Sequence, residues 1–376
     1  MLKYIYLLLI VINVLCVISG KKYKSVSVFS IVFIISFLVG VEYNESVVGY
    51  DLRNYEIMYN DTSLISSLEI GYKLVNIACN LVGLSFYQFH MILIIICFLL
   101  IFKHLYRINT NVHLIIVAYL LYFILPPTGQ LRNLCALTVF IRIFPIVQDD
   151  TKEQIKKEFL IITCASLFHI SFVMFYLIML IHIKRKNKNK YYKILFGIVV
   201  FITVASILLK RNKLFVELFK LVLKFGGDTG QIYVERYATT TTSMSPLASI
   251  VILLLLVYAI NIWGKKSLNE RYINCFYDST KLKIASESIK NIVFISACFL
   301  PLLILNATMY RFIRDISFVG IIHLGINCDG KIKIKNRVRL LIMTILICMG
   351  WFIYDVIIKG YWTDFAISFF ENSIWR

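Results

Sequence analysis

Three arginines of this chain stand at the ends of apolar stretches, where few cations are expected. Arg132 follows the turn-forming run Pro126–Gln130. Arg311 and Arg314 share one face of a helix at i,i+3 spacing. Arginine grips phosphate groups with two parallel hydrogen bonds, so these cations predict a diphosphate site at a membrane surface. Alternatively they are anchors that snorkel to the interface, and Arg314 could pair with Asp315.

Acid–base chemistry would need a carboxylate or a histidine near these cations. His169 interrupts an apolar run, where a histidine is either a core residue or a proton carrier. Six carboxylates fall in segments that we expect on the outer side. Each could take a proton from a hydroxyl group or be a plain solvated charge. They are Asp51, Glu56, Asp61, Glu69, Asp228 and Glu235.

Six tyrosines crowd the same outer segments. Aromatic faces stack on sugar rings, whereas tyrosines at a lipid interface form a girdle with no ligand. The sequence leaves both readings open for Tyr50, Tyr55, Tyr59, Tyr72, Tyr233 and Tyr237.

The elements that position these residues are membrane helices. The chain has 376 residues, of which 59% are hydrophobic, and its mean hydropathy is +0.79. A soluble domain could not bury so much apolar surface. Apolar runs of about 15 to 22 residues recur, close to the length that crosses a bilayer. We therefore expect an all-α polytopic transmembrane bundle with about 11 or 12 spans, forming a single integral membrane domain over residues 1–376.

Charge sets the orientation of the bundle. Most of the lysines and arginines behind the net charge of +19 fall in six short blocks between apolar runs. Basic loops mark the cytoplasmic side, and this explains the charge without nucleic acid. Two outer segments follow: a loop with an interfacial helix at 42–85, and a large loop with an amphipathic helix at 210–245. The nine cysteines form no CxxC pair, which predicts neither a disulfide frame nor a metal site.

One stretch does not fit a simple crossing. Residues 159–183 have basic flanks on both sides, yet about 25 residues are too few for two full helical crossings. We expect two short or re-entrant helices with a break near Phe168 and His169. Non-helical backbone at membrane depth is tolerated only against protein or water, so His169 is predicted at the floor of an outward-facing cavity.

Several short segments, in chain order, resemble the motifs of one protein family. Gly49–Tyr59 resembles G-x-D-x-x-x-Y-x-x-x-Y, and Glu69–Tyr72 followed by Gly83 resembles E-P-G-Y … G with Ile70 in place of proline. Further resemblances are Gly129–Ala136 to R-Q-x-x-A with Asn133 in place of glutamine, Ala165–Ser171 to A-x-x-F-H-x-S, and Tyr310–Phe312 to a late outer arginine. Together these segments resemble the EpsG family of Wzy-type bacterial polysaccharide polymerases.

The resemblance implies a fold similar to the multi-spanning GT-C class, with its active site on the periplasmic or extracellular face of a bacterial inner or plasma membrane. It implies transfer of a growing glycan from undecaprenyl diphosphate to the next lipid-linked repeat unit of an O-antigen, capsule or exopolysaccharide. Combined with the residue chemistry above, our hypothesis is that Asp51, Glu69, His169 and Arg132 act in catalysis, that Arg132, Arg311 and Arg314 bind the diphosphate, and that Tyr55, Tyr72 and Tyr237 contact sugars.

The expected partners are the lipid-linked oligosaccharide, membrane lipids, and a chain-length regulator and flippase of the same pathway. No cofactor or metal is expected. Two other functions compete with a polymerase. An O-antigen ligase shares the leaving group and uses a different acceptor. A lipid-oligosaccharide flippase or other transporter would carry charge near mid-membrane and two similar halves. Charge within the predicted spans is scarce, Arg142 being the main exception, and we find no half-repeat.

The orientation can be tested by labelling single cysteines from outside in a cysteine-free background. Cysteines at Asn54, Gly230 and Met309 should react with an impermeant reagent, because their segments are predicted outside. Cysteines at Lys188 and Ile334 should not react until the membrane is opened. Labelling of position 188 in intact cells would overturn the orientation.

Overall fold

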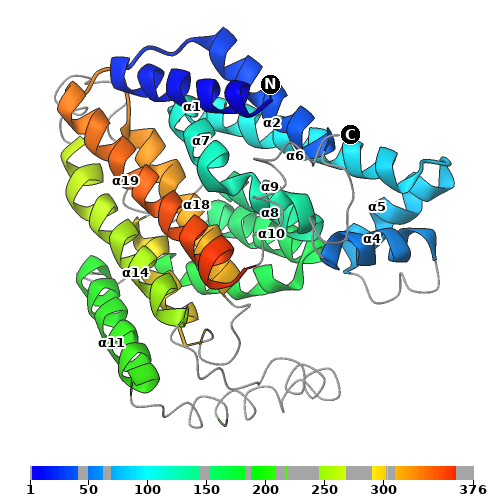
Figure 1. Ribbon diagram of the computed structural model, residues 1–376. Helices are drawn as coiled ribbons and strands as arrows, with labels where there is room; N and C mark the ends of the chain where they lie inside the picture. The colour runs from blue at the N-terminus through cyan, green and yellow to red at the C-terminus, as the bar shows by residue number, and fades with distance from the viewer. Residues whose placement is uncertain are drawn as a thin grey trace.

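The computed structural model describes residues 2–40, 50–61, 69–143, 152–182, 188–208, 217, 245–267, 290–301, 303 and 310–360. Within these ranges every regular element is a helix, and no strand occurs (Figure 1). The expected helical membrane bundle is therefore confirmed. Tyr237 and nearly all of the segment 210–245, with its predicted amphipathic helix, lie outside the described residues.

Among the described residues, four helices are long and apolar enough to cross a membrane: Phe86–Arg107, Lys190–Leu208, Leu247–Ser267 and Ile334–Ile358. Five shorter apolar helices accompany them. Large apolar side chains on their outer faces are exposed, as in Leu8, Leu99, Phe201 and Val251. Such faces suit a lipid solvent, and the number of crossings stays a prediction.

The first two apolar runs predict helices at about 2–19 and 25–41, and the structure agrees to within one residue. α1 (Leu2–Ser19) and α2 (Lys24–Gly40) form a hairpin at one edge of the bundle (Figure 1). A buried polar contact fastens α1 to its neighbours: Asn13 Nδ2 donates to Ser30 Oγ at 2.8 Å, and Asn13 Oδ1 lies 2.8 Å from His113 Nδ1. An apolar environment strengthens such bonds because water does not compete for them.

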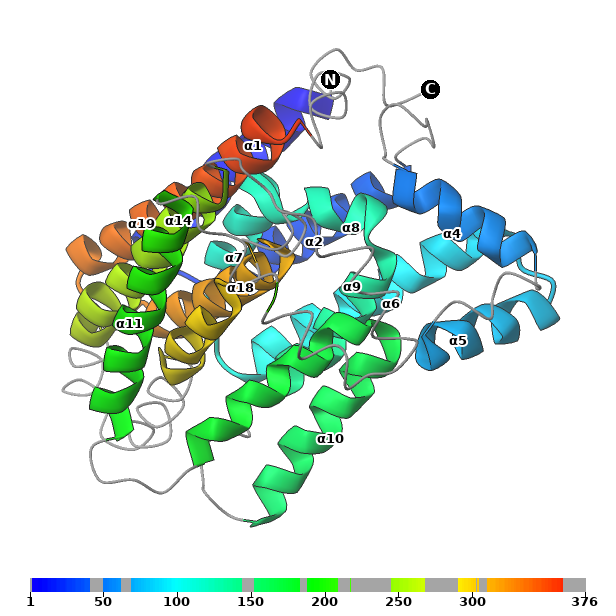
Figure 2. The same ribbon diagram turned by 90° about the horizontal axis from the view of Figure 1, so that it is seen from below.

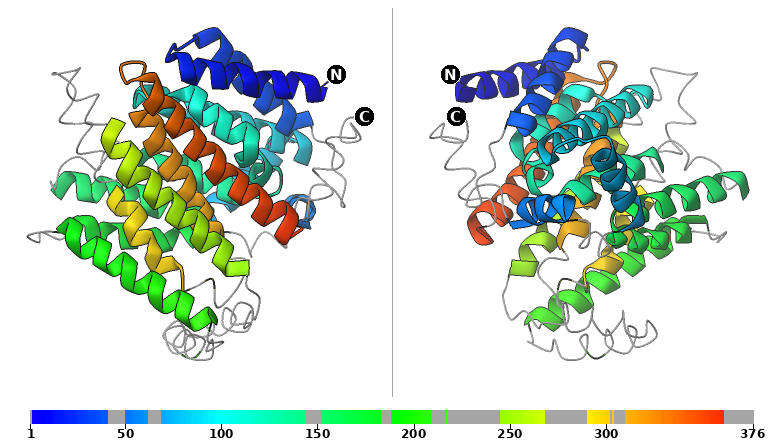
Figure 3. Two further views of the ribbon diagram at one scale, coloured as in Figure 1. Left: turned by 60° about the vertical axis from the view of Figure 1, so that its left-hand side comes forward. Right: turned by 90° about the vertical axis from the view of Figure 1, so that its right-hand side faces the viewer.

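Three helices from the C-terminal half of the chain pack side by side (Figure 3, left). α14 (Ser245–Tyr258) and α19 (Ile334–Phe352) each end in a π-helical turn, Ala259–Gly264 and Ile353–Ile358. α18 (Tyr310–Asn327) lies against both. A Cβ on Gly320 would meet Leu256 Cδ1 at 2.5 Å, so α18 and α14 approach closely there.

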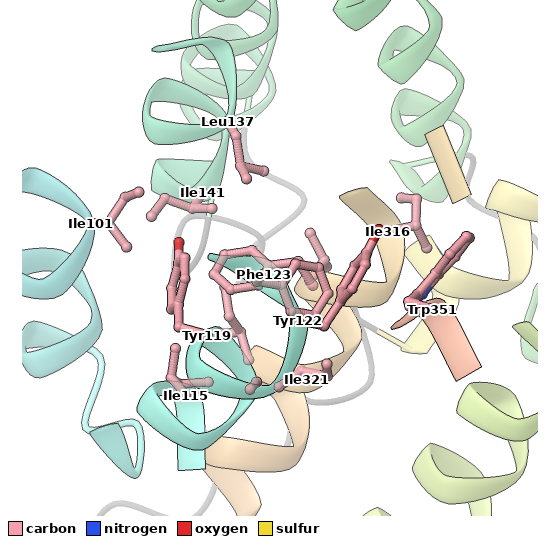
Figure 4. Packing of buried hydrophobic residues seen from close by; sticks show 14 of the residues in the cluster. Ile101, Ile115, Tyr119, Tyr122, Phe123, Leu137, Ile141, Ile316, Ile321 and Trp351 are labelled. Atoms are coloured by element: carbon pink, nitrogen blue, oxygen red, sulfur yellow. The ribbon is translucent and has the colours of Figure 1, made fainter. Parts of the chain in front are cut away.

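The proline turn differs from its prediction. We expected Pro126–Gln130 to break a helix at the outer surface, but both prolines and Gln130 are buried. α7 (Val112–Ala118) continues into a π-helical turn, Tyr119–Phe123, then the short α8 (Leu125–Gly129) and α9 (Leu131–Phe140). Proline is tolerated at the first positions of a helix because no amide there needs a partner. Figure 4 shows Tyr119, Tyr122 and Phe123 packed deep in the bundle.

The predicted break near His169 is confirmed. α10 (Lys152–Phe168) ends there, and a 3-10 helix, Ile170–His182, runs back beside it as a hairpin (Figure 2). Both arms of this hairpin are longer than the short helices we expected. α10 begins within the basic flank, and the 3-10 geometry of the second arm has a larger rise per residue than an α-helix. The 17 residues of α10 span about 25 Å, and the 13 residues of the 3-10 arm about 26 Å. Each arm thus approaches the bilayer core thickness of about 30 Å.

Two further elements correct the predicted boundaries. The predicted outer segment 42–85 holds one more helix than we expected, because α4 (Tyr50–Asn60) is helical. α5 (Ile70–Leu81) forms as expected and exposes Ile70, Leu74 and Leu81, as an interfacial helix would. α18 already begins at Tyr310, so Arg311 and Arg314 lie within its first turns and not at the end of an apolar stretch, as the sequence had suggested.

Gly71 tests the contact between α5 and α10. A Cβ there would lie 2.9 Å from Leu167 O, a backbone atom that cannot rotate away. Gly71→Ala should therefore destabilise the protein by about 1–3 kcal/mol, the usual cost of overpacking. Thermal unfolding of the purified protein measures this. Gly197→Ala in α11 (Lys188–Leu208) meets nothing within 4 Å and should be neutral or stabilising by up to roughly 1 kcal/mol. Equal effects of the two changes would contradict the close contact.

Candidate active site

An ion pair between Arg132 and Glu69 joins two helices at one end of the bundle. Arg132 lies in the first turn of α9, and Glu69 precedes the first residue of α5. Arg132 Nη1 lies 2.6 Å from Glu69 Oε2, and 27% and 14% of the two side chains are exposed. The pair is thus largely shielded from water but still reachable, which strengthens it relative to a surface ion pair.

The second oxygen of Glu69 meets the tip of the α10 hairpin. Glu69 Oε1 accepts a hydrogen bond from the backbone N–H of Ile170 at 3.2 Å and lies 3.5 Å from His169 Nδ1. The N–H groups that begin a helix have no partner within it, so a carboxylate is stabilised there. One side chain therefore fastens α5, α9 and the hairpin tip together.

These contacts determine the charge of Glu69. Burial alone would raise the pKa of its carboxyl, but the contacts with His169 and Arg132 outweigh burial and lower that pKa to about 2 from the usual 4.5. Glu69 is consequently ionised at any physiological pH. In this state it is a strong partner for Arg132 and a weak acceptor of protons.

Two tyrosines form the wall behind Arg132. Its Nε donates to Tyr55 Oη at 3.2 Å, and its guanidinium lies 5.3 Å from the centre of the Tyr55 ring. The Tyr55 ring packs against that of Tyr72 at 5.7 Å. Tyr55 and Tyr72 are only 6% and 0% exposed. In this geometry neither ring has an open face on which a sugar could stack in the predicted way. The geometry favours a role in holding Arg132.

A second charged cluster lies deeper, around Arg314. Its side chain is 1% exposed, so the expectation that Arg314 is exposed at a surface is wrong. Arg314 Nη2 donates to Gln130 Oε1, and Arg314 Nε lies 3.9 Å from Asp315 Oδ1, the predicted partner. Asn133 Nδ2 donates to the same Asp315 oxygen at 3.3 Å. The four side chains border a cavity of about 20 Å³, enough for a single water molecule.

Asp355 extends this cluster and was missed by the sequence analysis. It is fully buried, and Tyr122 Oη donates to its Oδ2. A carboxylate inside an apolar helix was itself a signal, because intramembrane charges are costly and usually functional. With Arg314 and Asp315, it also shows that charge within the helices is not as scarce as expected.

The start of α9 connects the two clusters. Gln130 binds Arg314, Arg132 binds Glu69, and Asn133 binds Asp315. Three polar side chains within residues 130–133 thus bind partners in both clusters. Among the described residues, His169 and Arg311 also lie close enough to Asp315 to interact with it electrostatically. The two clusters are therefore parts of one site.

Comparison with protein-family models matches residues 25–367 to the EpsG family. The chain belongs to the EpsG family. Membership indicates a polysaccharide polymerase-type function and, at that level, a glycosyltransferase-like enzyme of the membrane. Comparison with curated proteins found no match, and comparison with solved structures found none.

The EpsG-like segments meet at this site. Glu69, Arg132 and His169 come together from three segments, and Gly71 provides the close approach of α5 to the hairpin. Arg311 lies partly buried in the first turn of α18. Asp51 lies in the first turn of α4, and its side chain is outside the described part of the chain. Among the described residues, no group of three His, Cys, Asp or Glu side chains could hold a metal ion.

The ion pair makes a prediction about stability and pH. Because the pKa of Glu69 is lowered in the folded protein, its contribution to stability is full above pH 4.5 and disappears as the pH falls toward 2. Glu69→Gln should cost about 1–3 kcal/mol at pH 7 and much less near pH 3, measured by thermal unfolding. Glu153→Gln breaks an exposed pair with Lys157 and should change stability little at any pH. A Glu69→Gln cost that is constant with pH would contradict the pairing.

Proposed function

We propose that this EpsG-family protein polymerises lipid-linked oligosaccharide repeat units on the outer face of a bacterial inner or plasma membrane. The growing glycan is transferred from undecaprenyl diphosphate to the next repeat unit. The observation that carries the proposal is the meeting of Arg132, Glu69 and His169 in a shielded but accessible position. This set provides a carboxylate with an anion-binding cation on one oxygen and a proton carrier near the other.

The reaction makes one bond and breaks one. A hydroxyl oxygen of the acceptor sugar bonds to the anomeric carbon of the donor glycan, and the bond from that carbon to the diphosphate breaks. The hydroxyl proton passes to a carboxylate, for which Glu69 and Asp51 are the candidates. The diphosphate leaves as an anion that cations stabilise, here Arg132 with Arg311. No metal or cofactor is required in this scheme.

Glu69 can act as a base only after it exchanges partners. With a pKa of about 2 it holds a proton poorly while it is bound to Arg132. A diphosphate that binds Arg132 in two-pronged fashion would displace the carboxylate. Released from the cation, Glu69 would become more basic, beside His169, which can donate a hydrogen bond or carry the proton onward. Substrate binding would thus prepare the base.

Arg314 has a supporting place in this scheme. Its fully buried guanidinium is already bound to Gln130 and lies near Asp315. We assign it to positioning the start of α9, and thereby Arg132, in place of the direct diphosphate contact first predicted. Arg311, which is partly buried, keeps the predicted diphosphate role.

Two other functions use the same substrate. An O-antigen ligase would need the same leaving-group site with a different acceptor. A flippase is favoured by one observation, the buried charges Arg314, Asp315 and Asp355, because transporters carry such groups along their pathways. These groups also pair with one another and with the start of α9. That pairing fits a structural role, in which they hold α9 in place, equally well.

Variants of Arg132 test the proposed diphosphate contact. Arg132→Ala should abolish long glycan chains and leave single repeat units, as seen on a gel of the polymer. Arg132→Lys should restore little, because a point charge cannot reproduce the two-pronged grip. Arg142→Ala removes an exposed arginine that follows the same helix and should leave chain length normal. Full-length chains with Arg132→Ala would reduce Arg132 to an anchor.

Variants of His169 separate a polymerase from a flippase. In a polymerase, His169→Ala should still let single repeat units reach the outer face, where they are ligated or accumulate. In a flippase, the units stay inside and no one-repeat product appears outside. His169→Leu has a broadly similar volume and should cost less than about 1.5 kcal/mol of stability if the residue only packs. A normal ladder of chain lengths in His169→Leu would remove His169 from the site.

A further inference from the structure

A basic cavity lies at the other end of α6 (Phe86–Arg107) from the candidate active site. It has a volume of about 540 Å³ and is formed by the turn between α1 and α2, the last turn of α6, and the turn that leads into α7. Three lysines line it, together with polar side chains and one valine. The lining residues are Lys22, Lys24, Ser27, Lys103, Tyr106, Asn109, Thr110, Val112 and His113.

The lysines provide positive charge that carboxylates do not neutralise. Lys22, Lys24 and Lys103 are exposed, and among the described residues none of them forms an ion pair. They come from two predicted inner blocks that are far apart in sequence and meet only in the fold. Three ammonium groups around one cavity attract an anion more strongly than the same groups spread over a surface.

A buried hydroxyl group at the cavity lacks a partner. Thr110 is only 3% exposed, and its Oγ1 makes no hydrogen bond within the described structure. Thr110 follows Asn109, whose φ of +54° closes the turn after α6, and its own N–H donates to Leu105 O at 3.2 Å. The turn therefore fixes Thr110 in place. A buried hydroxyl without a partner is costly, and a phosphate oxygen would satisfy it.

The surroundings indicate which source of phosphate fits. Beyond Lys24 along α2, Val28 and Phe29 are exposed, and Leu99 and Tyr106 are exposed on α6. Helices α2 and α6 pack together. A ligand with an anionic head and apolar tails could therefore place its head among the lysines and its tails on this surface, whereas a free phosphate would use only the head site.

We propose that this cavity binds the phosphate head of an anionic phospholipid of the inner leaflet. Lys22, Lys24 and Lys103 neutralise the phosphate, the Thr110 hydroxyl donates to it, and the acyl chains lie along α2 and α6. The site lies outside the polymerisation machinery and does not depend on the proposed function.

The proposal can be tested with protein reconstituted in phosphatidylcholine nanodiscs that contain a titrated fraction of phosphatidylglycerol. Bound phosphatidylglycerol is counted by native mass spectrometry. Removing Lys22, Lys24 and Lys103 together, each by Lys→Ala, should weaken binding at least about tenfold. The matched control is Lys21→Ala, Arg107→Ala and Lys335→Ala, which removes three exposed cations that do not line the cavity. It should change binding less than about twofold.

Two further measurements make the test specific. Thr110→Val keeps the side-chain shape, removes the donor, and should weaken binding about threefold to tenfold. Phosphatidylglycerol should raise the unfolding temperature of the wild type and not that of the cavity variant. Equal losses in the cavity and control variants would overturn the proposal, since binding would then be general surface attraction. Competition by inorganic phosphate at the concentration of the lipid would also overturn it, by showing that the tails contribute nothing.

Discussion

A guanidinium group cannot remain in a helical bundle without a partner, and this constraint organises the site. Arg132 begins α9 where the surrounding helices are apolar, so its charge must be balanced nearby. Glu69 does this with one oxygen and uses the other to cap the tip of the α10 hairpin. The same requirement recurs in the buried cluster, where Arg314 meets Gln130 and Asp315. Charge balance therefore decides how α5, α9, α18 and the hairpin are arranged.

The start of α9 can meet this requirement because of the prolines before it. Pro126 and Pro127 occupy the first turn of α8, and the chain is no longer helical at Gln130. This change of direction points successive side chains toward different neighbours: Gln130 and Asn133 toward α18, and Arg132 toward α5. A continuous helix would have placed residues 130 and 133 on one face and residue 132 about 130° from the midpoint between them, without freedom to adjust. The buried break is thus part of the site.

The sequence predicted the features that depend on neighbouring residues. The bounds of α1 and α2 follow from apolar length, and the break at His169 follows from two basic flanks around a stretch of limited length. Contacts between distant helices could not be predicted this way. Tyr122 and Asp355 are 233 positions apart, and Arg314 and Gln130 are 184 apart, so neither carries a local periodicity. The surface position predicted for Arg314 was wrong because the residue was placed at the end of an apolar stretch, whereas it lies inside α18 and is buried.

The strength of the Glu69–Arg132 pair bears on how a substrate could enter. If Glu69 and Arg132 stood apart in the empty site, each charge would bear the cost of desolvation without a partner. In the ion pair each charge has a partner. In the proposed reaction the incoming diphosphate replaces one anion by another at Arg132, so the guanidinium is never left alone. The displaced carboxylate still has the Ile170 N–H and His169 beside it, which limits the cost of its release. The exchange thus requires an anion that binds Arg132 better than a carboxylate does, and a two-pronged diphosphate meets that requirement.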